Sequence, residues 1–290
     1  MNWLESLNDV LEYIEDNLEG EVSLDSCADI MCTSSFYFQR IFSYITGISL
    51  SEYIRRRKMT QAGFILKNSD EKIIDLAFRF GYSSPSSFTR AFKSIHGITP
   101  SKARKVESTL NSYPKIEFKV DILNGKSMKY KIKELDEFKI IGKSIKLTDE
   151  MDKNQIIASN FWKEMLKPNN FNEILSLDPN ANNIYGVTEV KSPDEIYYYI
   201  GVKQTSKSIS FKKIDTCIIP KSRWVIFENE KDIKTDVQNT FKRFYSEWLI
   251  FSGYSYGFLP DVEIYPLSDN SNVKNSKVLI SIKKENENEL

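Results

Sequence analysis

FQRIFSYITGI at residues 38–48 and FTRAFKSIHGI at residues 88–98 match each other at a constant offset of 50. Both copies carry apolar residues at positions i, i+4 and i+7, which is the spacing of one face of an α-helix. The apolar stripe consists of Phe38, Phe42 and Ile45 in the first copy and of Phe88, Phe92 and Ile95 in the second. The chain therefore contains one helical unit twice.

A shorter helix precedes each copy. Ala28 and Ala77 correspond at an offset of 49, so one residue has been inserted between the two blocks, at the turn Gly81-Tyr82. A small alanine at a helix crossing lets the two helices approach closely, as a tight helix-turn-helix requires. Residues suited to helix ends complete each unit, with Ser34 and Ser84 as N-caps and Gly47 and Gly97 as C-caps.

Two further helices are predicted around these units. Residues 51–67 form one long connecting helix, which ends at Asn68-Ser69-Asp70. A helix before the first unit follows from apolar residues spaced three and four apart, namely Leu4, Leu7, Leu11, Ile14 and Leu18.

The balance of 40 basic and 40 acidic side chains conceals a segregation of charge. Residues 1–29 hold nine acidic residues and no basic one, residues 30–106 hold 13 basic against four acidic, and residues 107–290 hold 27 of each. A local positive excess is typical of a surface that faces nucleic acid, although a basic helix face is more often simply solvated. The charge therefore supports DNA binding only together with the repeated helix-turn-helix.

Few residues are available for catalysis or metal binding. The chain has one histidine, His96, and three cysteines, Cys27, Cys32 and Cys217, none of them in a Cys-x-x-Cys pair. A catalytic triad or a histidine-rich metal centre would have to be built around His96. We instead expect His96 to end a helix, where a partly positive imidazole ring meets the negative end of the helix dipole. Cys27 and Cys32 are expected in a helical core. We predict that the protein is not an enzyme and holds no metal or other cofactor.

No segment approaches the roughly 18 consecutive apolar residues that a membrane-spanning helix needs. The N-terminal residues MNWLE are acidic where a signal peptide would be basic. We therefore expect a cytoplasmic protein without a membrane partner.

Residues 22–105 resemble the DNA-binding domain of the AraC/XylS family of bacterial transcription regulators. The resemblance rests on Ala28, FQRIF at 38–42, Gly47, EYIRRRKM at 52–59, Ala77, GY at 81–82, SFTRAFK at 87–93, GITPS at 97–101 and Arg104. Ala103 departs from the family, which usually has a bulkier residue there. The resemblance implies that the long helix holds two helix-turn-helix units about one turn of DNA apart, so that one monomer reads an asymmetric site in adjacent major-groove segments.

The resemblance also assigns contacts with DNA by position. Base contacts are expected from Ser35, Phe36, Gln39, Arg40 and Ser43 in the first unit and from Pro85, Ser86, Ser87, Thr89, Arg90 and Lys93 in the second. Phosphate contacts are expected from Ser34, Arg55, Arg56, Arg57, Lys58, Ser84, Arg104 and Lys105. Arginine can bridge two acceptors of guanine and glutamine can pair with adenine, whereas phosphate contacts position without specifying. Partial burial is the alternative for Phe36, and one or two of the three consecutive arginines must point away from DNA.

The pattern changes from helical to β beyond a polar segment at residues 107–114. Strands are expected at 130–135 and 138–147, paired as a hairpin, and at 184–190, 196–202, 217–219, 224–228, 262–265 and 278–283; helices are expected at 155–166 and 233–250. We therefore predict two domains: an all-α DNA-binding domain at 1–106 with two helix-turn-helix units joined by a linker helix, a linker at 107–127, and an α+β domain at 128–290 with two β-α-β-β halves.

Residues 128–285 resemble the GyrI-like effector-binding domain. The resemblance rests on FKIIG at 138–142, IYGV at 184–187, Trp248-Leu249 through Gly253-Tyr254, PDVEIY at 260–265 and ISIKK at 280–284. It implies that Glu263 supplies a carboxylate to an aromatic-lined pocket for a cationic or amphipathic molecule, which suits the attraction of cations to ring faces. The alternative is a Glu263 that faces solvent.

Seven aromatic residues are candidate pocket walls, although aromatic residues in a small sheet domain more often belong to the core: Phe161, Trp162, Tyr185, Tyr197, Tyr199, Trp224 and Tyr256. Alternation along a strand places Tyr197 and Tyr199 on one face and Tyr198 on the other. The pattern does not decide which of the two faces meets the ligand.

An AraC-type reader in front of a GyrI-like domain is the arrangement of right-origin-binding type regulators. It implies a sequence-specific transcription regulator, an activator, that binds promoter DNA as a monomer, contacts RNA polymerase and responds to a small-molecule effector. Two alternatives stay open for the C-terminal domain: a protein-contact or sequestration module without a ligand, or a small-molecule hydrolase with Glu263 as base.

Overall fold

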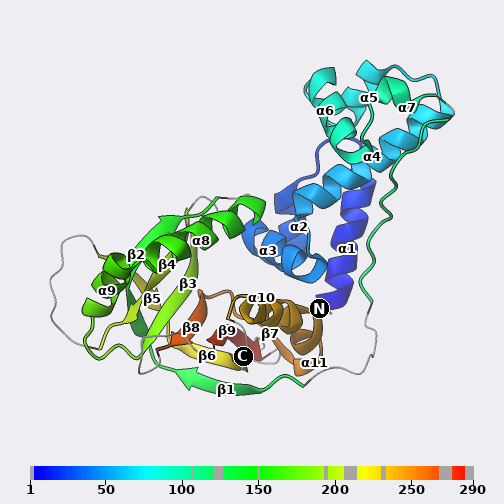
Figure 1. Ribbon diagram of the computed structural model, residues 1–290. Helices are drawn as coiled ribbons and strands as arrows, with labels where there is room; N and C mark the ends of the chain where they lie inside the picture. The colour runs from blue at the N-terminus through cyan, green and yellow to red at the C-terminus, as the bar shows by residue number, and fades with distance from the viewer. Residues whose placement is uncertain are drawn as a thin grey trace. The chain divides into compact units, whose positions relative to one another are not determined.

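The structure, a computed structural model, describes residues 3–105, 107–119, 127–148, 151–192, 195–205, 214–229, 233–267 and 276–284, without the side chains of 151–152 and 233–236. Two compact units divide between Ile122 and Leu123 (Figure 1). This boundary falls within the linker predicted at 107–127, and residues 107–119 of that linker pack on the first unit. Residues 120–126 of that linker lie outside the described residues.

The first unit is helical, as predicted. Its helices are α1 (Trp3–Asp16), α2 (Leu24–Ile30), α3 (Ser35–Thr46), α4 (Leu50–Asn68), α5 (Ile73–Arg79), α6 (Pro85–His96) and α7 (Pro100–Ala103). The long helix α4 contributes to two apolar cores. Its first turns, with Leu50 and Tyr53, pack with α1, α2 and α3, and its later turns, with Met59 and Leu66, pack with α5, α6 and α7. One helix therefore supports both helix-turn-helix units.

The predicted helix ends are confirmed in both units. The Ser34 hydroxyl accepts a hydrogen bond from the Tyr37 amide, and the Ser84 hydroxyl accepts one from the Ser87 amide. Gly47 and Gly97 end α3 and α6 with the same left-handed φ of 74°. Of the two cysteines predicted in the helical core, Cys27 is buried. The prediction for Cys32 is wrong, because Cys32 is exposed in the turn between α2 and α3.

The segment after α7 is held along the first unit by hydrogen bonds rather than left as a free linker. The Ile116 amide donates to the Tyr53 hydroxyl at 3.3 Å, and the Phe118 amide donates to Asn8 Oδ1 at 2.9 Å. The Tyr113 amide donates to Thr60 Oγ1 at 3.1 Å. We call residues 107–119 the strap.

The second unit is a nine-stranded antiparallel sheet with helices. Its strands are β1 (Tyr130–Leu135), β2 (Phe138–Lys146), β3 (Asn183–Ser192), β4 (Glu195–Lys203), β5 (Asp215–Ile219), β6 (Ser222–Asn229), β7 (Tyr254–Tyr256), β8 (Asp261–Pro266) and β9 (Ser276–Lys284). The order across the sheet is β1-β6-β9-β8-β3-β4-β2-β5, and β7 pairs with β9. The predicted hairpin of β1 with β2 is wrong: β1 pairs with β6, whereas β2 pairs with β4 and β5.

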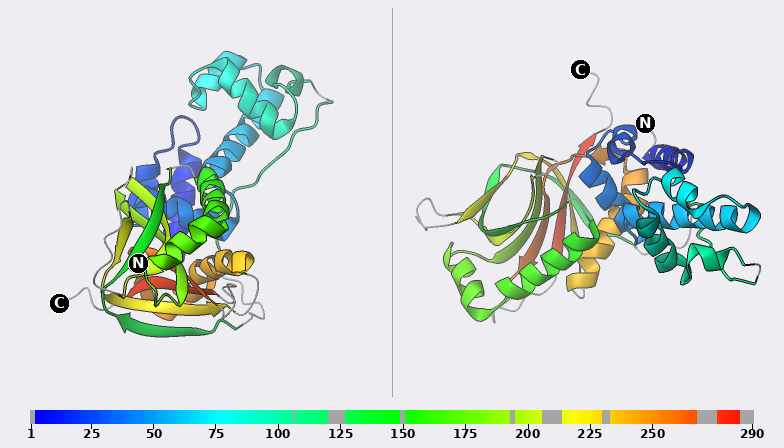
Figure 2. Two further views of the ribbon diagram at one scale, coloured as in Figure 1. Left: turned by 60° about the vertical axis from the view of Figure 1, so that its left-hand side comes forward. Right: turned by 90° about the horizontal axis from the view of Figure 1, so that it is seen from above.

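Two short links explain why the sheet curls (Figure 2). Only two residues separate β1 from β2, and only two separate β5 from β6, although these strands lie at opposite ends of the sheet order. Three Cα–Cα steps span at most about 11 Å, so the two ends must approach each other. The inner face of the curl then collects residues from both ends into one apolar cluster, among them Phe138, Ile219 and Trp224.

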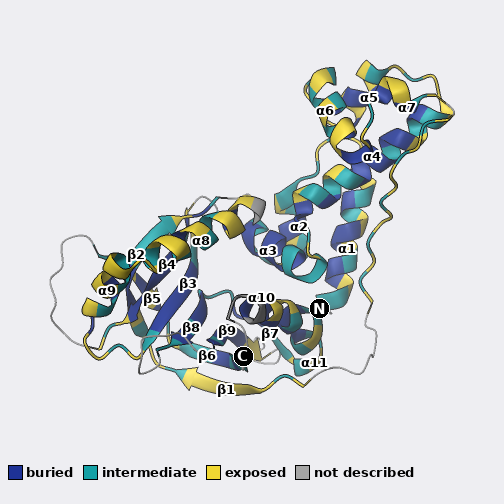
Figure 3. Cartoon of the chain, viewed as in Figure 1, coloured by how far each residue is buried: buried dark blue, intermediate teal, exposed yellow. Residues whose placement is uncertain are grey.

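Helices cover the other face of the sheet, which we call the outer face. These helices are α8 (Met151–Met165), α9 (Pro168–Ser176), α10 (Ile233–Arg243), the π-helical turn η1 (Phe244–Trp248) and α11 (Leu249–Ser252). On this face the Phe227 ring of β6 meets Phe244 and Trp248 of η1. Central strands such as β3 are largely buried, whereas the edge strand β1 is exposed (Figure 3).

Candidate functional site

Helix α6 presents a polar surface opposite its buried stripe. Phe88 and Phe92 are fully buried in the core of the second helix-turn-helix unit. The residues predicted to contact bases lie on the remaining surface of the helix: Ser86, Arg90 and Lys93 are exposed, and Pro85, Ser87 and Thr89 are half-buried. The structure therefore brings these six residues together on one accessible helix.

Serine hydroxyls at the start of α6 are linked to one another. The Ser84 hydroxyl lies 3.1 Å from the hydroxyls of both Ser86 and Ser87. The Ser87 hydroxyl donates to the Ser84 carbonyl at 2.7 Å. Ser87 is thus partly committed to the helix cap, while the hydroxyl of Ser86 stays exposed at the helix N-terminus.

Helix α3 is the corresponding helix of the first unit. Its helical periodicity places Phe36, Gln39, Arg40 and Ser43 opposite the buried Phe38–Phe42 stripe. Ser43 and Ser35 are half-buried, but Phe36, Gln39 and Arg40 keep only 3–4% of their surface exposed. The structure therefore places the predicted base contacts of the first unit together on α3.

The basic run on α4 divides between surface and interior. Arg55 and Arg56 both donate to Glu52 one turn earlier, and the Arg56 guanidinium lies 4.9 Å from the Tyr113 ring centroid. Arg57 instead points inward: Nε and Nη2 donate to the Glu15 carboxylate of α1 at 2.8 and 2.7 Å, and Nη1 donates to the Tyr113 carbonyl. The hydrogen bond to Glu15 raises the pKa of Arg57.

Lys58 is also an internal residue. Its ammonium donates to the carbonyls of Gly20 at 2.5 Å and Phe80 at 2.9 Å, and burial lowers its pKa. Arg57 and Lys58 are therefore corrected from phosphate contacts to residues that join α1 and the α5–α6 turn to α4. The other predicted phosphate contacts on this helix, Arg55 and Arg56, remain at the surface.

The predicted phosphate contacts after α7 are accessible to different extents. The Arg104 guanidinium donates to the Glu71 carbonyl and lies 4.0 Å from the Asp70 carboxylate, so it is partly neutralised. Lys105 is exposed. Ser34, the predicted phosphate contact of the first unit, is half-buried at the start of α3.

The predicted positive charge on His96 is wrong. His96 is the last residue of α6, as expected, but it is buried and its pKa is lowered by desolvation. Nε2 lies 2.9 Å from the Met59 carbonyl of α4, and Nδ1 accepts a hydrogen bond from the Asn111 amide of the strap at 3.2 Å. The neutral ring therefore ties together α6, α4 and the strap.

In the second unit, Glu263 lies on the outer face of the sheet and is 8% exposed. Its Oε2 accepts hydrogen bonds from the hydroxyls of Tyr198 and Tyr265, both at 2.8 Å. Trp162 of α8 donates from Nε1 to the Tyr198 hydroxyl at 2.8 Å, and its ring meets the Tyr265 ring edge-on at 5.0 Å. We call Glu263, Tyr198, Tyr265 and Trp162 the carboxylate cluster.

Gly186 makes room for this cluster. It pairs with Glu263 across β3 and β8. A Cβ atom on Gly186 would lie 2.5 Å from the Tyr198 hydroxyl and 2.8 Å from Glu263 Oε2. The missing side chain thus lets the carboxylate and the phenol meet above the strand.

The other predicted pocket residues do not join Glu263 at one place. Tyr185, Tyr197, Tyr199 and Trp224 project from the inner face, on the opposite side of the sheet. There the Tyr199 hydroxyl donates to Glu189 at 2.8 Å, and burial raises its pKa. These four residues are therefore corrected from walls of the Glu263 site to residues of the inner face.

Phe161 and Tyr256 have separate surroundings. Phe161 is 9% exposed on α8, next to Trp162. The Tyr256 hydroxyl lies 3.1 Å from both carboxylate oxygens of the buried Asp261, and its ring contacts Phe258. Tyr256 thus belongs to a second phenol–carboxylate pair.

Sequence reasoning missed Tyr198 and Tyr265. Tyr265 could have been found, because residues two apart on a strand share a face and Glu263 was already singled out. Tyr198 could not have been found, since alternation alone leaves open which face of β4 lies on the same side of the sheet as Glu263.

Within the parts of the chain that the structure describes, no group of three or more His, Cys, Asp and Glu residues is placed to hold a metal ion. Among the same residues, no helix is both long and apolar enough to cross a membrane.

Comparison with known proteins identifies both units. A family model described as "Helix-turn-helix domain" matches residues 27–106, and one described as "Integron-associated effector binding protein" matches residues 131–282, more than half of the 290 residues. The multiple antibiotic resistance protein MarA of Escherichia coli is 41% identical over 99 residues, 34% of this chain and 78% of MarA. The transcriptional activator AarP of Providencia stuartii is 35% identical over 114 residues, 39% of this chain and 84% of AarP.

Among solved structures, SAV2435 bound to tetraphenylphosphonium aligns with a TM-score of 0.46 and 18% identity over 54% of this chain and 94% of that one. The family models and the MarA and AarP sequences decide the assignment. The second unit is a GyrI-like domain of the effector-binding type, and an AraC-type helix-turn-helix domain precedes it. The chain therefore belongs to the integron-associated effector binding proteins and is a DNA-binding transcription regulator.

Proposed function

We propose that this regulator activates transcription from promoters that it reads as a monomer, and that a cationic or amphipathic small molecule bound at the carboxylate cluster controls this activity. The DNA part rests on one observation. Both helix-turn-helix units are complete, capped and packed on the same α4, so a single chain carries two recognition helices. An asymmetric promoter site then needs no second copy.

The bases are read by α6 and α3. On α6, Arg90 is exposed and can bridge the O6 and N7 acceptors of guanine. Arg40 holds the equivalent position on α3. Arg55, Arg56 and Lys105, which lie at the surface, supply sequence-independent attraction to phosphates.

The DNA-binding step is tested with a cognate duplex selected from a random library. Arg90→Ala and Arg40→Ala should each cost about 1–3 kcal/mol on that duplex and little on a scrambled one. Arg79→Ala is the matched control, because that exposed arginine pairs with Glu19 and Glu71. Equal losses on both duplexes would make the arginine a phosphate contact. The stoichiometry of the complex tests the monomer, and transcription with purified bacterial RNA polymerase tests activation.

The ligand part rests on the geometry of Glu263. Two phenol hydroxyls hold its carboxylate, and the Trp162 and Tyr265 rings lie beside it. A fixed negative charge among ring faces attracts a lipophilic cation both electrostatically and by burial of apolar surface. Because Glu263 is 8% exposed, an entering ligand must displace a neighbouring side chain such as Trp162.

Calorimetry with tetraphenylphosphonium on the full chain tests this site. Glu263→Gln keeps the size of the side chain and removes its charge, so it should abolish or strongly weaken binding. Glu189→Gln is the matched control, since Glu189 also accepts a tyrosine hydroxyl but on the inner face. No binding by the folded wild type would favour a protein-contact or sequestration role for the second unit and leave the DNA-binding proposal intact.

A further inference from the structure

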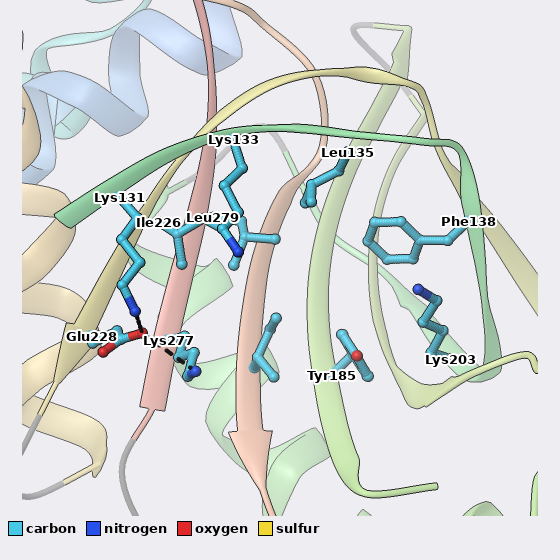
Figure 4. A pocket seen from close by; sticks show the side chains of 11 residues that line it. Lys131, Lys133, Leu135, Phe138, Tyr185, Lys203, Ile226, Glu228, Lys277 and Leu279 are labelled. Atoms are coloured by element: carbon cyan, nitrogen blue, oxygen red, sulfur yellow. Dashed lines mark hydrogen bonds and ion pairs between the residues drawn. The ribbon is translucent and has the colours of Figure 1, made fainter. Parts of the chain in front are cut away.

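The inner face of the curled sheet carries a hollow, on the side opposite Glu263. It has a volume of about 290 Å³ and is lined by residues of seven strands (Figure 4). Its charged residues are Lys131, Lys133, Lys203, Lys277 and Glu228. Four ammonium groups against one carboxylate leave the hollow strongly positive.

The two ends of the hollow differ in how their lysines are held. At one end Glu228 accepts from Lys131 at 3.0 Å and lies 3.5 Å from Lys277, and the hydrogen bond from Lys131 lowers the pKa of Glu228. One carboxylate is thus shared by two ammonium groups. At the other end the Lys203 ammonium lies 4.7 Å from the Phe138 ring centroid. Lys133 and Lys203 form no ion pair with any residue that the structure describes.

The floor between the two ends is apolar. Figure 4 shows Ile226 and Leu279 between the Lys131–Glu228–Lys277 group and the Phe138–Lys203 group. The Phe138 and Tyr185 rings lie with their centroids 6.4 Å apart at the Lys203 end. A positive rim above an apolar and aromatic floor suits a ligand that has negative groups at its ends and an apolar body. The negative groups would pair with the lysines, and the apolar body would pack on the floor.

We infer that this hollow binds an amphipathic organic anion, best a flat aromatic body with a carboxylate at each end. One carboxylate would pair with Lys131 and Lys277 and compete with Glu228, and the other would pair with Lys203 and Lys133. The volume lies near the lower limit of ligand pockets, so the ligand is small. This site is independent of the proposed cation site, because the two lie on opposite faces of the sheet.

The test is calorimetry of the full chain with naphthalene-2,6-dicarboxylate and with its uncharged diamide. The dianion should bind saturably, at least tenfold more tightly than the diamide, and raising the salt from about 0.1 M to 0.5 M should weaken it. Lys203→Gln with Lys133→Gln should weaken dianion binding at least tenfold. Lys139→Gln is the matched control, since Lys139 lies on β2 next to Phe138 but projects from the outer face.

Lys139→Gln and Glu263→Gln should leave dianion binding unchanged. Equal affinity for dianion and diamide, an equal loss in the Lys139 variant, or no saturable binding by the folded protein would overturn the inference. The lysines of β1 would then serve only to keep an edge strand from pairing with other chains. Retention of dianion binding in Glu263→Gln separates the inference from the proposed cation site.

Discussion

Cys32 and Gly81 adopt the same left-handed backbone conformation at equivalent points of the two helix-turn-helix units. Their φ angles are 49° and 77°. The flanking hydrogen bonds also coincide: Thr33 N donates to the Ala28 carbonyl and Tyr82 N to the Ala77 carbonyl, both at 3.0 Å. The turn of the first unit thus needs a glycine-like conformation but has a cysteine.

Cys32→Gly should therefore stabilise the first unit. A side chain in the left-handed region costs roughly 1–2 kcal/mol, and the greater freedom of glycine in the unfolded chain offsets part of the gain. We expect a net increase of about 0.5–1 kcal/mol in the free energy of unfolding, measured by chemical denaturation. Cys32→Ala is the control, since it removes the thiol and keeps the strain, and an equal gain in both variants would contradict the explanation.

Gly81→Ala should have the opposite effect at the equivalent position. A Cβ atom there would lie 2.3 Å from the Gly20 carbonyl oxygen, in addition to the backbone strain. We expect a loss of at least about 1–2 kcal/mol in the free energy of unfolding. Gly47→Ala is the matched control: φ is also positive, but no atom lies within 4 Å of the added Cβ, so it should cost less.

The ion pair of Arg57 with Glu15 should be needed for folding rather than for DNA affinity. The exposed side-chain fractions are 9% and 14%, so Glu15→Gln leaves a nearly buried guanidinium without its counter-charge. Breaking such a pair costs about 3–5 kcal/mol, which denaturation of the variant would measure. Glu12→Gln on the same helix should cost under about 0.5 kcal/mol, because its 4.0 Å pair with Lys115 is exposed.

The helical half of the molecule could be predicted from the sequence because a helix is a local structure. The period of 3.6 identified Phe88 and Phe92, and caps such as Ser84 fixed the ends. Arg57 and Lys58 could not be separated from Arg55 and Arg56 in this way. A run of four basic residues surrounds a helix, and only the tertiary partners Glu15 and Phe80 decide which two turn inward.

The strands other than β7 were predicted, but the pairing of β1 was not. Two residues between β1 and β2 favour a hairpin locally, yet the chain carries β1 to the far end of the sheet to pair with β6. The same limit applies to Glu263. Alternation shows that Tyr198 and Tyr199 face opposite ways, whereas only the pairing of β3 with both β4 and β8 places Tyr198 beside the carboxylate.

Gly186→Ala should disable the carboxylate cluster without unfolding the sheet. The added Cβ would push the Tyr198 hydroxyl away from Glu263, since it would lie 2.5 Å from that oxygen. Tetraphenylphosphonium binding should weaken several-fold, while binding of naphthalene-2,6-dicarboxylate to the inner face should not change. Tyr198→Phe removes the same hydroxyl without adding an atom to the strand. Unchanged cation binding in both variants would show that Tyr198 does not position Glu263.

Stability of the α6 region should fall as the pH drops below about 6.5. Burial lowers the pKa of His96 below its ordinary 6.5, so at acidic pH the unfolded chain binds a proton that the folded chain refuses. The contribution of the neutral His96 ring to the free energy of unfolding is fully present above pH 6.5. It is lost as the pH falls from 6.5 to the pKa of His96 in the folded protein, at up to about 1.4 kcal/mol per pH unit. Hydrogen exchange of α6 amides at pH 7.5, 6.0 and 5.0 would measure this loss. His96→Gln lacks the titrating ring, so the difference in stability between wild type and variant should shrink with acidity. A difference independent of pH would mean that His96 is protonated equally in both states.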